Sequence, residues 1–93
     1  MTNEQFIERL QQPNWYVNCD TEHKVDLVLH SCRTAGISSD KMEEMIKILG
    51  CPIDIGFSRF FDTIEYAHNG AFEILELKNI TDCFFSSAKG VIQ

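Results

Sequence analysis

Residues that end helices divide this chain into short segments, and their spacing limits what it can fold into. Pro13 follows the first apolar segment, and Gly36, Gly50 and Gly70 follow later ones. Proline cannot continue a helix, and glycine readily takes the left-handed conformation in which helices end. No segment reaches the roughly 20 apolar residues that a membrane-spanning helix needs. The 93 residues therefore predict a single compact domain, residues 1–93, built from short elements.

Apolar residues recur at helical spacing in four of these segments. The clearest pattern, at i, i+3, i+4 and i+7, predicts a buried face made of Met42, Met45, Ile46 and Leu49. Asp20 is placed to cap the helix that precedes this one. The apolar side chains of the fourth segment are also expected to be buried, namely Phe57, Phe60, Phe61 and Ile64. We expect helices over Asn3–Gln11, Thr21–Ala35, Ser38–Leu49 and Phe57–His68.

Three further segments are rich in aromatic and β-branched residues, which favour strands. We expect a small antiparallel sheet of Trp15–Cys19, Phe72–Leu77 and Thr81–Ser86. Between the helices and strands we expect a loop at Cys51–Gly56 and a turn at Lys78–Asn79. Two segments also fit the other structure, Val25–Leu29 as a strand and Ala71–Leu77 as a helix. The predicted fold class is α+β, with about four short helices packed on the sheet.

The four cysteines follow no metal-binding or redox spacing. The N-terminal residues contain no basic region followed by an apolar block, so we expect no signal peptide and a cytoplasmic protein. Free thiols are then favoured over disulfides. Cys32 and Cys83 are expected to pack in the core, whereas Cys19 and Cys51 lie near element ends and are expected to be more accessible.

The best candidate metal ligands are Cys19, His23, His30 and Cys32. On a helix Cys32 points away from His30, because two residues correspond to a rotation of about 200°. No signature of a cysteine nucleophile surrounds any histidine or cysteine. Neighbouring carboxylates such as Glu43 and Glu44 are typical of a solvated helix face rather than of acid–base catalysis. We therefore expect no catalytic residues, no metal and no cofactor, which means a protein that is not an enzyme.

The formal net charge of −6 constrains the kind of partner. Lys and Arg are scattered singly, which argues against direct binding to nucleic acid or to an anionic membrane. An acidic surface favours a basic partner, although it can also serve solubility alone. Carboxylates three or four residues apart on a helix lie roughly 5–6 Å apart, close to the spacing of nucleic-acid phosphates. The expected partner-binding residues are Glu4, Glu8, Asp40, Glu43, Glu44, Asp62, Glu65, Glu73 and Glu76.

These features predict a non-enzymatic acidic protein that inhibits or modulates a basic nucleic-acid-binding protein, in the manner of a DNA mimic. In size and charge the chain resembles the accessory proteins, such as anti-restriction proteins, that phages and mobile elements direct against host machinery; the resemblance is compositional only. One alternative is an assembly domain with an apolar dimer face, because the aromatic residues of the second half exceed what a small core holds. Another alternative is a small zinc-binding or Cys/His protein.

Overall fold

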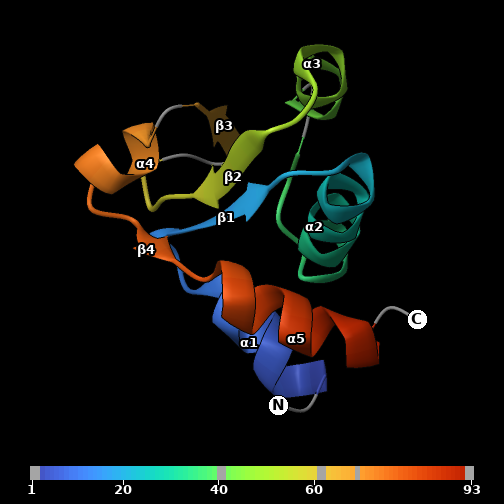
Figure 1. The fold of residues 1–93 in the computed structure, drawn as a ribbon. Coiled ribbons are helices and arrows are strands. Elements are labelled where there is room, and N and C mark those ends of the chain that lie inside the picture. The colour runs from blue at the N-terminus through green and yellow to red at the C-terminus, as the bar shows by residue number, and fades with distance from the viewer. Residues whose placement is uncertain (1–2, 40–41, 61–62, 69, 92–93) are drawn as a thin grey trace.

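The computed structural model describes residues 3–39, 42–60, 63–68 and 70–91, and within these ranges the chain forms five helices and a four-stranded sheet (Figure 1). The helices are α1 (Asn3–Gln11), α2 (Glu22–Thr34), α3 (Met42–Leu49), α4 (Ala71–Ile74) and α5 (Thr81–Val91). The strands are β1 (Trp15–Cys19), β2 (Ile53–Phe57), β3 (Glu65–Ala67) and β4 (Lys78–Asn79). This arrangement confirms the predicted α+β class. None of the described helices is both long and apolar enough to cross a bilayer.

The sheet is mixed rather than antiparallel, with strand order β3-β2-β1-β4. β2 is antiparallel to β1, and Trp15 lies opposite Phe57. β3 is antiparallel to β2, whereas β4 is parallel to β1. Of the three strands predicted, only Trp15–Cys19 is a strand in the structure. The prediction of a purely antiparallel sheet is therefore wrong, and so are two of its members.

Side chains alternate across β1 and divide the core into two parts. Trp15, Val17 and Cys19 enter the main cluster, which also contains buried residues of α1, α2 and α5. Tyr16 points to the other side of the sheet and packs with Phe72, which belongs to α4. Figure 1 accordingly shows α4 and the pair α1 and α5 on different sides of the sheet. The predicted common face of Trp15, Val17 and Cys19 is confirmed.

α1 and α2 begin and end close to the predicted positions, whereas α3 begins at Met42 rather than at Ser38, which instead forms a bridge with Thr63. α1 has the predicted bounds, and α2 is a helix through the segment Val25–Leu29, for which a strand was the alternative. The residue that caps α2 is Thr21 rather than Asp20: the Thr21 hydroxyl accepts a hydrogen bond from the Lys24 N–H at 3.2 Å. Asp20 instead pairs with the Lys24 ammonium at 2.8 Å.

The predicted loop Cys51–Gly56 and the predicted helix Phe57–His68 are both wrong. Residues 53–57 form β2, because Ile53 and Ile55 alternate with Asp54 and pair with β1. After β2 the chain forms β3 instead of a helix. Phe60, expected in a buried stripe, is 85% exposed, and Phe61 lies outside the described residues.

The last two strands of the predicted sheet are helical. The segment Phe72–Leu77 contains most of α4, as its helical alternative indicated, and Thr81–Ser86 lies within α5. Asn79 Oδ1 accepts a hydrogen bond from the Thr81 N–H at 3.0 Å, which satisfies a donor at the start of α5. The predicted turn Lys78–Asn79 is the short strand β4.

Candidate protein-docking site

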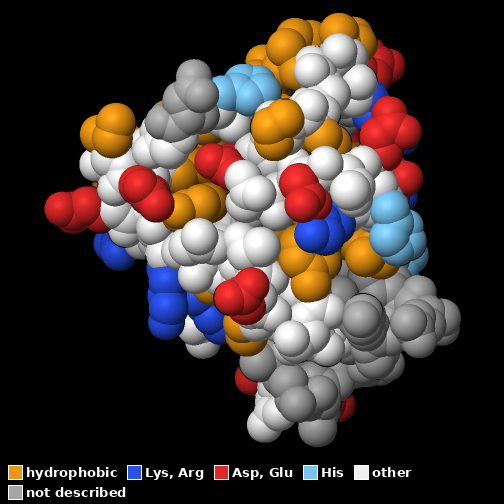
Figure 2. Space-filling model, in the orientation of Figure 1, with side chains coloured by type: hydrophobic (Ala, Val, Ile, Leu, Met, Phe, Trp, Pro, Cys, Tyr) orange, Lys and Arg blue, Asp and Glu red, His pale blue; other side chains and the backbone are white. Residues whose placement is uncertain are grey.

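Helix α3 exposes half of the apolar face that was expected in the core, namely Met45 and Leu49, and it also exposes Ile48. Ile46 is 1% exposed, but Met45 is 41%, Leu49 is 45% and Ile48 is 76% exposed. Residues three and four apart lie side by side on a helix, so these exposed side chains form one strip. We call Met45, Ile48 and Leu49 the α3 face. Figure 2 shows hydrophobic side chains gathered over this helix.

Local contacts hold α3 against the rest of the molecule. The Ser39 hydroxyl donates a hydrogen bond to Glu43 Oε2 at 2.7 Å, and the Arg33 guanidinium pairs with Glu43 Oε1. These contacts tie the start of α3 to the end of α2. The Ser39 hydrogen bond and the nearby Arg33 charge hold the pKa of Glu43 below its usual value. The α3 face is therefore presented on a helix that is anchored to α2.

Acidic side chains border α3. Glu44 is exposed and lies one helical turn before Ile48. On the side of α2, Glu22 and Asp26 line a groove that α3 closes with Ile46 and Lys47. Glu44 thus borders the apolar strip, whereas Glu22, Asp26 and Lys47 line the groove between α2 and the Ile46 side of α3. Glu22 and Asp26 were not among the expected partner-binding residues, although their four-residue spacing on a predicted helix would have placed them on one face.

The structure brings only some of the nine expected acidic residues together. Glu43 and Glu44 lie on α3, but Glu4 and Glu8 lie on α1, which Figure 1 shows at the opposite end of the molecule. Glu65 belongs to β3. The described acids therefore do not form one continuous band, and their role as partner contacts stays a prediction.

The other expected residues lie near α4 or outside the described ranges. Glu73 lies within α4, where its Oε1 accepts a hydrogen bond from the Tyr16 hydroxyl at 3.2 Å, and Glu76 follows the helix. Asp40 and Asp62 lie outside the described residues.

The cysteines are free thiols; Cys32 is buried as expected, whereas the burial of Cys19 and the exposure of Cys83 are the reverse of what was expected. Cys19 and Cys32 are fully buried, Cys51 is half-buried and Cys83 is exposed. Cys19 is buried because it shares a face of β1 with Trp15, and Cys83 is exposed because α5 turns Phe84 inward instead. Burial raises the pKa of both Cys19 and Cys32 to about 12. Among the described residues, no three His, Cys, Asp or Glu side chains are placed to hold a metal ion.

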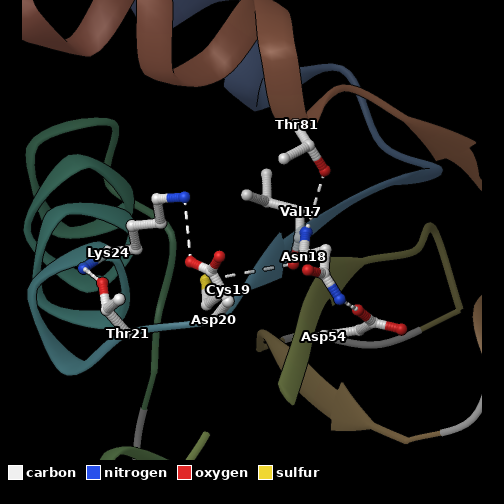
Figure 3. A network of polar contacts seen from close by, with 8 residues as sticks. All are labelled: Val17, Asn18, Cys19, Asp20, Thr21, Lys24, Asp54 and Thr81. Atoms are coloured by element: carbon white, nitrogen blue, oxygen red, sulfur yellow. Dashed lines mark hydrogen bonds and ion pairs between the residues drawn. The ribbon is translucent and has the colours of Figure 1, made fainter. Parts of the chain in front are cut away.

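A network of polar contacts lies where β1, β2 and α5 meet (Figure 3). The Asn18 amide donates a hydrogen bond to Asp54 Oδ1 at 2.7 Å, and the Asn18 N–H donates to the Thr81 hydroxyl at 2.9 Å. Asp54 is only 7% exposed. In the described part of the chain, no buried side-chain nitrogen or oxygen lacks a hydrogen-bond partner. This network therefore connects the elements of the fold and leaves no buried group aimed at a ligand.

Comparisons of the chain with protein-family models, with curated proteins and with solved structures found no significant match. No role is therefore carried over from a relative. The α3 face and its acidic border carry the functional interpretation by themselves.

Proposed function

We propose that this protein is a non-enzymatic binding protein that docks through the α3 face on a basic protein and modulates it. The expected class of partner is a nucleic-acid-binding protein. The observation that carries this proposal is the exposure of three large apolar side chains on one side of a helix that is otherwise anchored in the fold. Contiguous exposed apolar surface on a small domain is typical of a protein–protein interface.

The energetic reason lies in the apolar strip itself. A surface helix normally turns its apolar side chains to the core and its polar ones to water. Here the apolar side of α3 extends from buried Ile46 to exposed Ile48, so that part of this side is in water. A partner that covered Ile48 would gain on the order of 1–2 kcal/mol from that side chain alone.

The charge around α3 indicates a basic partner. A stable interface covers about 800 Å² on each protein, more than three side chains supply. Contacts must therefore extend to the neighbouring surface, where Glu44, Glu22 and Asp26 outnumber Lys47. The net charge of −6 adds long-range attraction to a cationic surface. Nucleic-acid-binding proteins carry such surfaces because they neutralise phosphates.

Two related functions receive less support from the geometry. A row of carboxylates that imitates DNA would need the acids of α1 and α3 on one side, and Figure 1 places these helices apart. A symmetric dimer through the α3 face would bring two copies of the same acidic border together. The local acidic border of α3 suits a cationic surface better than it suits a second α3 face.

Substitution of Ile48 tests this function. We expect the variant Ile48→Ser to lose at least tenfold in affinity for the partner, because the most exposed apolar contact is removed without a change of charge. Ile74→Ser is the matched control, since Ile74 is an equally exposed isoleucine (82%) on α4. Lysate proteins are captured on wild type and on both variants. Those that are retained by wild type and Ile74→Ser but not by Ile48→Ser are identified by mass spectrometry, and affinities are then measured with the purified partner.

The proposal requires that the proteins lost with Ile48→Ser include a basic nucleic-acid-binding protein, and that its binding weakens as salt is raised. Retention of the same proteins by Ile48→Ser and wild type would show that α3 is not the docking site. If the proteins lost with Ile48→Ser were all acidic, the proposed basic character of the partner would be wrong.

A further inference from the structure

A second exposed apolar surface lies at the other end of β2 from α3. Phe60 is 85% exposed and Leu75 is 59% exposed, and both line one hollow. We call it the Phe60 hollow; its lining includes Asn14, Ser58, Arg59, Phe60, Leu75 and Glu76. The hollow combines the end of β2 with the turns before β1 and after α4.

The backbone around the Phe60 hollow is held in an unusual conformation. Asn14 (φ +72°) and Glu76 (φ +63°) are the non-glycine residues of the described chain with positive φ, and both line it. The Asn14 N–H donates to the Phe57 carbonyl at 2.6 Å, and the Asn14 carbonyl accepts from the Lys78 N–H at 2.9 Å. Backbone in this region is retained where the surroundings hold it firmly, often at binding surfaces. The hollow is thus preformed.

Around this hollow and the groove beside it three cations, Arg59, Lys78 and Arg9, outnumber two carboxylates, Glu76 and Asp82, in contrast to the border of α3. Arg59 lines it, and Lys78 directly follows the lining residue Leu77. Arg9 and Lys78 together line the adjoining groove at the start of α5. Neither of the ion pairs between described residues involves any of these three cations. Figure 2 shows Lys and Arg side chains gathered beside β4.

We infer that the α3 face of one copy of this protein docks in the Phe60 hollow of a second copy, so that the chain associates head to tail. The apolar strip with an acidic border on α3 is complementary to the apolar hollow with a cationic border. The less abundant charge on each surface is complementary as well, since Lys47 lines the groove beside α3 and Glu76 lines the hollow. A symmetric contact between two α3 faces would instead oppose acid to acid.

One molecule cannot make this contact within itself. α3 ends just before β2, and the Phe60 hollow begins where β2 ends. A five-residue strand separates its ends by on the order of 15 Å, so the two surfaces lie apart and point to different neighbours. Head-to-tail contacts of this kind close into a ring or extend into a chain.

This contact rests on the proposed function, because it uses the same α3 face. It also regulates how much of that face is available to the basic partner. A copy whose α3 face is docked in a hollow cannot present that face to the basic partner. Self-association and partner binding therefore compete, and a tight partner dissociates the assemblies by mass action.

Sedimentation velocity over a wide micromolar range tests the inference with charge-reversed variants. We expect wild type to self-associate and to dissociate as salt is raised. Glu44→Lys and Arg59→Glu should each weaken association at least fivefold. An equimolar mixture of the two should restore it, because the intact α3 face of one meets the intact hollow of the other. Glu8→Lys on α1 is the control with the same charge change, and it should behave as wild type.

Circular dichroism confirms that each variant is folded. A wild type that stays monomeric throughout, or folded variants that do not associate when mixed, would overturn the inference. The proposed function is separable from it. Arg59→Glu keeps its α3 face, free of self-association, and should capture the basic partner at least as well as wild type, whereas Ile48→Ser should lose both partner and self-association. If Arg59→Glu self-associates like wild type, the Phe60 hollow is not the docking site. If Ile48→Ser captures the partner like wild type, the proposed function is wrong.

Discussion

Glu43 shows how one side chain can be needed for the position of a whole helix. Its carboxylate accepts a hydrogen bond from Ser39 and pairs with Arg33, so that it connects the start of α3 with α2. A carboxylate engaged in this way is not free to be the main contact of a partner. Of the two neighbouring acids, Glu44 is the exposed one and the better candidate for docking.

The lowered pKa of Glu43 predicts a dependence of stability on pH. The Ser39 hydrogen bond and Arg33 stabilise the ionised form in the folded chain only, so the unfolded chain binds its proton at a higher pH. This part of the stability is present above the ordinary pKa of 4.5 and is lost as the pH falls through the lower, folded value. Glu43→Gln should unfold more easily in urea near neutral pH and lose less stability than wild type on acidification. If the free energies of unfolding of both proteins fell equally as the pH was lowered, this role of Glu43 would be contradicted.

Asn18 is the residue that satisfies a buried carboxylate. Asn18 and Asp54 lie opposite each other on β1 and β2, and the amide is 2.7 Å from the carboxylate. Asn18→Ala should lower the free energy of unfolding by about 1–3 kcal/mol, since it leaves Asp54 without this partner. Urea denaturation measures the change, and Gln12→Ala at an exposed position is the control. Equal stability of the two variants would show that the hydrogen bond contributes nothing.

At the scale of elements, the first half of the chain was predictable and the second was not. α1, β1 and α2 carry their own boundary signals, such as Pro13 after α1 and Gly36 (φ +77°) after α2. β2 and α5 depend on distant partners. The Phe84–Phe85 pair suggested a strand, yet Phe84 is buried in a helix against Phe6, with ring centroids 5.3 Å apart. Local propensity is overridden where packing supplies more free energy.

Gly56 is a residue of β2 that sequence patterns assign to a loop. It lies opposite Tyr16, and a Cβ atom there would come within 3.0 Å of the Trp15 carbonyl oxygen and 3.1 Å of the Phe72 ring. The glycine therefore makes room for α4 to pack on the sheet. Gly56→Ala should destabilise the fold by about 1–3 kcal/mol through overpacking. Thermal unfolding checks this, and a variant as stable as wild type would show that the Phe72 ring moves aside freely.

At the scale of the molecule, charge is distributed unevenly. Arg9, Arg59 and Lys78, which the sequence scatters, line neighbouring hollows and outnumber the acids Glu76 and Asp82 there, whereas acids outnumber Lys47 beside α3. The net charge of −6 conceals this asymmetry. Directional association of the kind inferred for α3 and the Phe60 hollow depends on it, because overall charge alone would only keep copies apart.

Composition and periodicity by themselves determined the α+β class, the helices α1 and α2, the strand β1 and the apolar side of α3. These properties depend on neighbours within a few residues, whose spacing sets which side chains share a face. Only the tertiary structure decided that β2 pairs with β1, that α5 is helical, and that Met45, Ile48 and Leu49 meet water. A periodic pattern shows that a helix has an apolar side, but whether another element covers that side depends on segments distant in the chain.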